Sequence, residues 1–184
     1  LATLITHRFK CYFGQEQNPS DIKEIVPQPL SPGQGSYCDF LMQHGFQFED
    51  RVCLILSFVP YLKPQLMDCF GIKNSDTSQR FVEFGCEDWE QGKMLLPTLE
   101  TVMFVLAGND VGERMRLSAC FTQHPVFSNV SYFKTRHEEA SRCFFRVMEP
   151  SDALLDVLLL ERPFVPRFSS DFPARKITTK RNWA

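Results

Sequence analysis

Hydrophobic residues recur at helical spacing along much of this chain, most clearly in residues 95–110. One face of the helix predicted there follows the i, i+3, i+4, i+7 spacing, at Leu99, Val102, Met103 and Leu106. Pro97 and Thr98 are typical of a helix start, and Gly108 is typical of a helix end. The segment therefore predicts a complete helix whose apolar face belongs to the core.

Similar start signals predict two more helices in the C-terminal half. Asp110 is placed to cap a helix that runs to about Phe121, and Glu113 three residues later completes the pattern of a capping box. Ser151 is placed to cap a last helix over residues 153–160, although this leucine-rich run is also compatible with a buried strand.

The N-terminal half predicts further short helices, at residues 2–13, 37–44, 48–60 and 64–70. Ser36 is placed to cap the second of these, with Asp39 as its capping-box partner, and Gly45 follows its end. Pro60 is expected to end the third, and Gly71 the fourth.

Extended structure is predicted only in short pieces. Residues 14–35 form a long loop with a short strand at 22–26, and strands are expected at 80–84, in an otherwise irregular segment, and at 142–147. Because strands do not alternate with helices, the pattern predicts a mainly α (α+β) domain rather than a doubly wound sheet.

Charge separates the last residues from the rest. The net charge is −2, but residues 161–184 hold six basic and two acidic side chains, a local +4, so the remaining 160 residues carry −6. We therefore expect a domain over residues 1–162 and a basic, extended tail over 163–184. The tail is interpreted as a linker, with a docking arm or a nucleic-acid contact as alternatives.

Cysteine usage and hydropathy indicate a cytoplasmic protein without membrane contact. The seven cysteines are odd in number and form no C-x-x-C pair, which is typical of reduced thiols. The apolar runs stay below the ~18 residues that a membrane-spanning helix requires. The 18 phenylalanines instead indicate an aromatic-rich core or an adhesive face.

The sequence contains no recognisable catalytic motif. It lacks a P-loop, a G-x-S-x-G elbow and an H-E-x-x-H pair, so no catalytic, cofactor-binding or metal-binding residue is predicted. One zinc-like spacing is formed by Cys120, His124, His137 and Cys143. It matches no common zinc finger, and core or surface roles are the favoured interpretation. No Cys/His pair is marked as an activated nucleophile either.

The candidate contact site is an acidic segment around a tryptophan, Glu87-Asp88-Trp89-Glu90. The favoured interpretation of this segment is a solvated loop whose indole ring packs on the domain. Because Trp is enriched at interface hot spots, the functional interpretation is that Trp89, with Glu87 and Asp88, is a candidate protein-contact site, and the proline-rich loop 14–35 is a second candidate surface.

Three segments also carry a family resemblance. They are Phe48-Glu49-Asp50-Arg51 through Pro64, then Glu83-Phe84-Gly85 with Leu96-Pro97-Thr98 and Glu100-Thr101, and finally Ser170-Asp171-Phe172-Pro173-Ala174 with Trp183. Together they resemble the winged-helix-type N-terminal domain that precedes the ATPase module of a group of bacterial AAA-type ATPases. Cys86 stands where a second glycine is common in that family. The resemblance implies a winged-helix-like domain of several short helices with a small β hairpin or wing.

The resemblance also implies a function. The tail would lead toward an ATPase module that this fragment lacks, so the fragment would be non-catalytic, while the full-length protein would bind ATP and Mg²⁺ and assemble as a homo-oligomeric ring. The domain would recruit a protein partner, and the family further suggests a link to contractile injection systems. The alternative is nucleic-acid binding through a recognition helix at 110–121, whose basic residues are Arg114 and Arg116.

Overall fold

The computed structural model describes residues 1–16, 29–89, 94–129, 131–134 and 146–163. Its α-helices are α1 (Ala2–Tyr12), α2 (Ser36–Gln43), α3 (Phe48–Leu62), α4 (Leu99–Ala107), α5 (Val111–Gln123) and α6 (Asp152–Leu160). Two 3-10 helices, η2 (Pro64–Gly71) and η3 (Val82–Phe84), precede an antiparallel hairpin of β1 (Glu87–Trp89) and β2 (Met94–Leu96). The predicted fold class, mainly α with several short helices and a small β wing, is confirmed.

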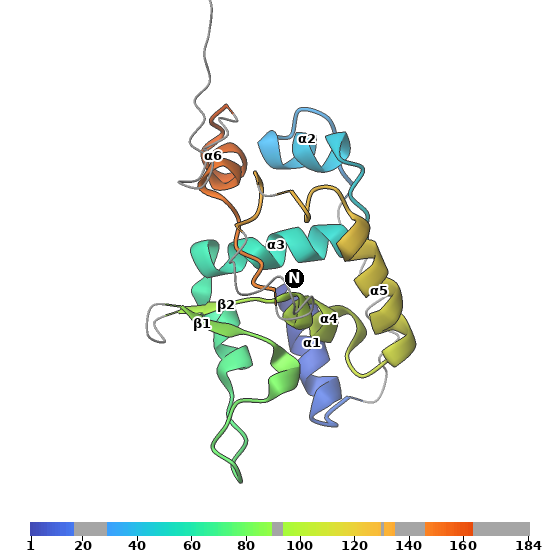
Figure 1. Cartoon of the computed structure of the whole chain (residues 1–184), viewed down its shortest axis with the longest axis vertical. Helices are drawn as coiled ribbons and strands as arrows, with labels where there is room; N and C mark the ends of the chain where they lie inside the picture. The colour runs from blue at the N-terminus through green and yellow to red at the C-terminus, as the bar shows by residue number, and fades with distance from the viewer. Residues whose placement is uncertain (17–28, 90–93, 130, 135–145, 164–184) are drawn as a thin grey trace, which may run out of the picture.

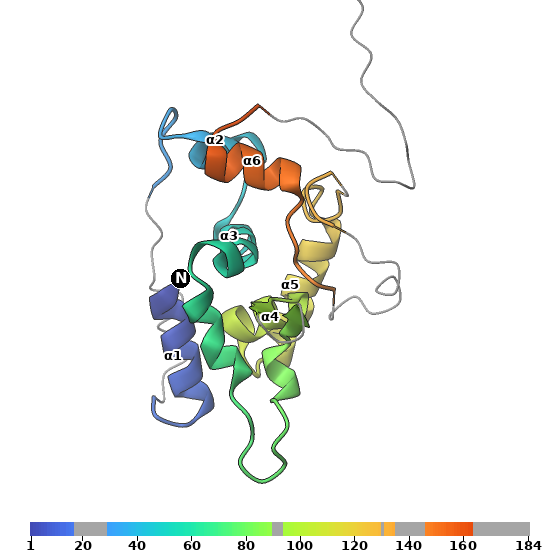
Figure 2. The same ribbon diagram turned by 90° about the vertical axis from the view of Figure 1, so that its left-hand side faces the viewer.

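The elements are arranged around α3, which crosses the middle of the molecule (Figure 1). On one side of it lie α1 and α4, which pack on each other, and α5 packs against α4. On the other side α2 and α6 lie side by side, as Figures 1 and 2 both show. The hairpin packs through β2 against η2 and α3.

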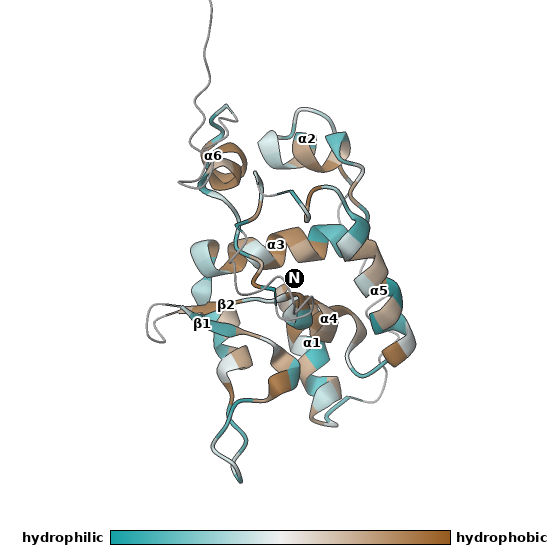
Figure 3. Cartoon of the chain, in the orientation of Figure 1, coloured by the Kyte–Doolittle hydropathy of each residue, from teal (hydrophilic) through white to brown (hydrophobic). Residues whose placement is uncertain are grey.

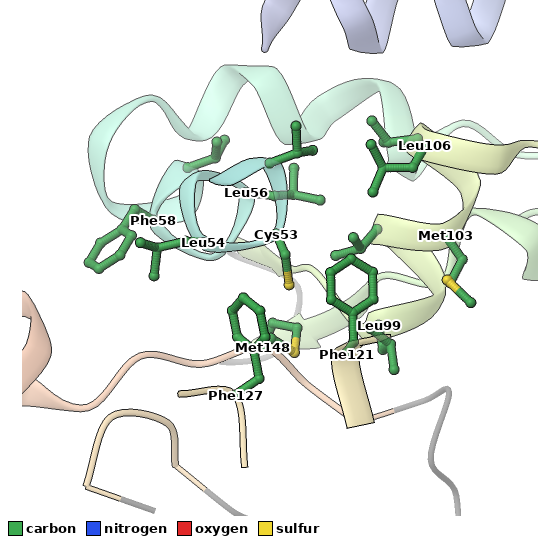
Figure 4. Packing of buried hydrophobic residues seen from close by; sticks show 14 of the residues in the cluster. Cys53, Leu54, Leu56, Phe58, Leu99, Met103, Leu106, Phe121, Phe127 and Met148 are labelled. Atoms are coloured by element: carbon green, nitrogen blue, oxygen red, sulfur yellow. The ribbon is translucent and has the colours of Figure 1, made fainter. Parts of the chain in front are cut away.

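Helix α4 is the central element of the core, because all nine of its residues are buried. In Figure 3 it is correspondingly brown along most of its length, whereas α5 mixes teal and brown. Figure 4 shows side chains of α3, α4 and α5 and of a later segment packed together, with Cys53, Leu99 and Phe121 close to Phe127 and Met148. The apolar face predicted for this helix thus belongs to the core, as expected.

A second part of the core is aromatic. Phe9 of α1, Phe84 of η3 and Phe104 of α4 pack edge to face or tilted, with ring centroids 4.8 to 5.3 Å apart. Such rings gain about 0.5–1.5 kcal/mol per pair beyond the burial of their area. Some of the many phenylalanines therefore lie in the core, where they pack α1 against the Glu-Phe-Gly turn.

Three predicted helix starts are confirmed by their hydrogen bonds. Thr98 Oγ1 accepts from the Thr101 N–H, Asp110 Oδ1 from the Glu113 N–H at 3.0 Å, and Ser151 Oγ from the Leu154 N–H at 3.1 Å. The last of these begins a helix, so the alternative of a buried strand at 153–160 is wrong.

Other local predictions are corrected. Ser36 is the first residue of α2 rather than its cap, since Gly35 holds the cap position and Asp39 Oδ1 accepts from the Gly33 N–H instead. Pro60 lies inside α3, which continues to Leu62. A proline near a helix end removes a single backbone hydrogen bond, which buried packing of its ring compensates.

The strand predicted at 80–84 is wrong. Residues 82–84 form the 3-10 helix η3, and Arg80 makes only an isolated bridge with Lys73. The hairpin instead uses residues 87–89 and 94–96. Residues 87–89 and 94 fall in the segment expected to be irregular, and residues 95–96 in the segment expected to lead into the helix. Three predictions lie wholly or partly outside the described residues: the strand at 22–26, residues 142–145 of the strand at 142–147, and the tail at 163–184 after its first residue. At the described end of the last predicted strand, Val147 forms an isolated antiparallel bridge with Thr98.

Arg8 of α1 forms hydrogen bonds to the C-terminal end of α4. Its buried guanidinium donates to the carbonyl oxygens of Val105 at 3.0 Å and Leu106 at 2.7 Å. Burial lowers the pKa of Arg8 from its ordinary value, and the partial negative charge at the helix C-terminus favours the cation. Gly108 lies against the guanidinium so closely that a Cβ there would overlap it.

Substituting Arg8 is expected to destabilise the domain. Arg8→Met would leave the two carbonyl oxygens of α4 without their donors, at a cost of about 2–3 kcal/mol in the free energy of unfolding. Urea denaturation followed by circular dichroism measures this change. Lys10→Met is the control, because the ion pair between Lys10 and Glu16, at 2.7 Å, is exposed, and exposed ion pairs contribute little to stability. Equal losses in both variants would contradict the role given to Arg8.

Candidate functional site

The predicted contact residues lie on β1 of the hairpin. Its register pairs Glu87 with Leu96, Asp88 with Leu95 and Trp89 with Met94. Because side chains alternate along a strand, Glu87 and Trp89 share one face and Asp88 points to the other. Both Glu87 and Trp89 are half-buried, so the indole ring is less exposed than the sequence suggested, whereas Asp88 is exposed. The structure therefore does not gather the three side chains on one face.

Asp88 belongs to a pocket beside the hairpin. Arg80 donates to Asp88 Oδ1 at 2.6 Å, and both side chains are partly exposed. The pocket has a volume of about 230 Å³ and is lined by Pro64, Met67, Asp68, Gly71, Arg80, Asp88, Met94 and Leu95. Its lining comes from η2, β1, β2 and the segment before η3. Sequence reasoning missed the pocket, because no local pattern links residues 64–71 to residues 94–95.

Large exposed apolar side chains closely precede and follow the pocket residues 64–71 in the sequence. Tyr61 and Leu62 end α3 just before the pocket residue Pro64, and Ile72 follows the pocket residue Gly71. Leu62 is 62% exposed, and Tyr61 and Ile72 are about 40% exposed. The pocket itself has a mixed lining of apolar and charged side chains. Exposed apolar side chains near such a pocket are typical of a surface that contacts another protein.

Two motifs of the second resembling segment, Glu83-Phe84-Gly85 and Leu96-Pro97-Thr98 with Glu100-Thr101, meet in space. The Thr98 hydroxyl donates to the Gly85 carbonyl oxygen, so the Glu-Phe-Gly turn is bound to the start of α4. Cys86 Sγ lies 3.5 Å from Thr101 Oγ1, and burial raises the pKa of the Cys86 thiol to about 12. Cys86 is thus a half-buried thiol held against α4, and its raised pKa disfavours the thiolate that a nucleophile requires.

The proposed recognition helix α5 offers little positive charge to a phosphate backbone. Arg114 forms an ion pair with Glu100 and also donates to the Gly108 carbonyl oxygen at 2.7 Å. Arg116 pairs with Glu113 at 2.7 Å and Glu49 at 2.8 Å, and these carboxylates raise the pKa of Arg116 above its ordinary value. Both arginines of the helix are therefore already matched by carboxylates, which disfavours phosphate binding there.

The zinc-like spacing is only partly within the described residues. Cys120 is exposed on α5, and His124 caps the turn that follows by accepting the Val126 N–H at Nδ1. His137 and Cys143 lie outside the described residues. A different group is brought together at the other end of the chain, where His7, Cys11 and Glu16 lie close to one another. The i, i+4 spacing of His7 and Cys11 was the signal that sequence reasoning overlooked.

Comparison with known proteins adds no relative. The chain matches no protein-family model, no curated protein and no solved structure. Among the described residues no single helix is long and apolar enough to cross a membrane. Helices α3 and η2 reach that length and composition only as a pair, and they are bent by 102° with respect to each other.

Proposed function

We propose that this chain is the non-catalytic N-terminal domain of a bacterial AAA-type ATPase and that it recruits a protein partner to the ATPase ring. The observation that carries the proposal is the pocket beside the hairpin with its exposed apolar border. The three resembling segments support the ATPase context. In that context ATP and Mg²⁺ bind a separate module, the full-length protein forms a homo-oligomeric ring, and the protein works in the cytoplasm.

The chemistry of the pocket selects the kind of partner. Met67, Met94 and Leu95 supply apolar surface, and methionine side chains adapt to differently shaped ligands. Two carboxylates, Asp68 and Asp88, face a single guanidinium, that of Arg80, so the pocket carries an excess negative charge. The segment that fits is an exposed peptide with an apolar side chain next to a lysine or arginine.

A peptide selection tests this function. Peptides selected from a random displayed library against the chain are expected to combine an apolar with a basic residue. Leu62→Lys is expected to weaken their binding by about tenfold or more, since it replaces exposed apolar surface with a positive charge that repels the basic residue of the peptide. Binding is measured by fluorescence anisotropy of labelled peptides. Leu160→Lys is the matched control, because Leu160 is similarly exposed, at 56%, but lies at the end of α6.

Three outcomes would reject the proposal or part of it. Equal weakening by both leucine variants would remove the pocket as the site. Salt-dependent binding of duplex DNA that Arg116→Gln weakens would favour the nucleic-acid function instead. The gene sequence beyond Ala184 tests the ATPase context separately, because a P-loop lysine motif is expected there and its absence would remove that context.

A further inference from the structure

Three side chains with metal-binding atoms converge at the C-terminal end of α1. His7 and Cys11 are four residues apart and therefore lie on the same face of the helix. Glu16 returns to this face because the chain turns at Gly14, where φ is +70°, and the Gln15 N–H bonds back to the Lys10 carbonyl oxygen at 2.8 Å. One donor atom from each of the three side chains lies within 4.8 Å of the other two.

We propose that His7, Cys11 and Glu16 form a binding site for a divalent transition-metal ion, with Zn²⁺ as the preferred ion. The proposal is independent of the function of the hairpin pocket. A nitrogen, a sulfur and an oxygen ligand form a set that suits Zn²⁺, whereas Ca²⁺ and Mg²⁺ require oxygen ligands throughout. Three protein ligands leave the fourth tetrahedral position to water.

The distances place the three groups close to coordination. His7 Nδ1 lies 2.6 Å from Glu16 Oε2, and Cys11 Sγ lies 3.5 Å from His7 Nε2. Zinc bonds of about 2.0–2.3 Å put neighbouring ligand atoms some 3–4 Å apart. Glu16 and Cys11 thus approach different nitrogens of the imidazole, and a single ion can bind only one of them. An ion bound at Nε2 beside Cys11 Sγ would require the more exposed Glu16 carboxylate to leave Nδ1 and move to that side of the ring.

Lys10 positions the Glu16 carboxylate beside His7. Its Nζ lies 2.7 Å from Glu16 Oε1, so one oxygen is held by the ammonium while the other, Oε2, faces His7. The ammonium therefore fixes the carboxylate at the C-terminal end of α1, with Oε2 next to the imidazole.

The burial of the group also suits a metal with one open position. The His7 side chain is 12% exposed and Glu16 is 36% exposed, while Cys11 is half-buried. The imidazole is thus shielded on most sides, and the carboxylate side remains open to water. Figure 2 shows α1 at the edge of the molecule, so the group is reachable from solvent.

Metal titration tests the site directly. The reduced chain, freed of metal with a chelator, is titrated with Zn²⁺ against a chromophoric competitor and separately with Co²⁺. We expect one ion per chain in the micromolar range or tighter, and a thiolate-to-cobalt charge-transfer band. Cys11→Ser should abolish that band, and His7→Gln should weaken zinc binding by more than about tenfold.

Two further variants keep the test decisive. Glu16→Gln alters a partly exposed side chain by one atom, so the fold persists, and it is expected to weaken zinc binding about tenfold. Cys38→Ser, at another half-exposed helical cysteine, should leave binding unchanged. Absence of micromolar zinc binding, or binding that Cys11→Ser leaves intact, would overturn the proposal. Loss of binding in Cys120→Ser alone would place the metal at the other cysteine-histidine group and overturn it equally.

Discussion

Phe84→Ala is expected to lower the free energy of unfolding by about 3–5 kcal/mol, the largest change predicted for this chain. The ring of Phe84 is fully buried. Its centroid lies 4.8 Å from that of Phe104, 4.9 Å from that of Phe9 and 5.2 Å from that of Tyr12. Truncation would open a cavity where α1, η3 and α4 meet, and the surrounding rings cannot collapse into it without losing their own contacts.

Urea denaturation measures the loss, and Phe13→Ala is its control. Phe13 borders the same aromatic group, with its ring centroid 6.5 Å from that of Phe84, but it is 44% exposed. Its truncation leaves no closed cavity and should cost about 1 kcal/mol or less. Losses of similar size in the two variants would show that the aromatic group does not form the core of this region.

Gly85→Ala is expected to cost about 2–4 kcal/mol, from two separate effects. The backbone of Gly85 has φ of +66°, a conformation that side chains disfavour. An added Cβ would also lie 2.6 Å from Glu100 Cβ and 2.7 Å from the Thr101 backbone nitrogen. The turn would have to move away from α4, and the hydrogen bond from Thr98 to the Gly85 carbonyl would weaken.

A second glycine separates the two effects. Gly45 has nearly the same backbone conformation, with φ of +64°, but no atom lies within 4 Å of the position of an added Cβ. Gly45→Ala should therefore show only the conformational cost of about 1 kcal/mol. The difference between the two variants in thermal or urea denaturation measures the overlap with α4. Equal costs would mean that the turn does not dock on α4 as described.

Both predictions concern the segments that carry the resemblance to the ATPase family. Phe84 and Gly85 of the Glu-Phe-Gly turn pack against α4. The residues of α4 and its cap that they meet include Thr98 and Thr101 of the Leu-Pro-Thr-x-Glu-Thr segment. The contacts between these residues join the turn to the core of the fold. The proposed contact site lies outside these residues, at the pocket between η2 and the hairpin.

Helix starts were predictable where the side chain of a single residue caps the helix. Thr98, Asp110 and Ser151 each accept a backbone N–H three residues away, so sequence spacing alone locates them. The prediction of Ser36 as a cap failed because a glycine with positive φ took that position. Residues 82–84 have the composition of a strand, but contacts with α4 hold them in a 3-10 turn.

The sequence by itself determined the succession of short helices, the apolar face of residues 99–107 and the mainly α class. Each of these depends on interactions between residues no more than four apart, which a pattern records directly. Only the tertiary structure decided the pairing of residues 87–89 with 94–96, the burial of Arg8 against α4 and the pocket shared by η2 and the hairpin. The hairpin pairs residues five to nine positions apart across a turn, and the other two contacts join residues far apart in the sequence. Their geometry follows from how the helices pack, which no local spacing encodes.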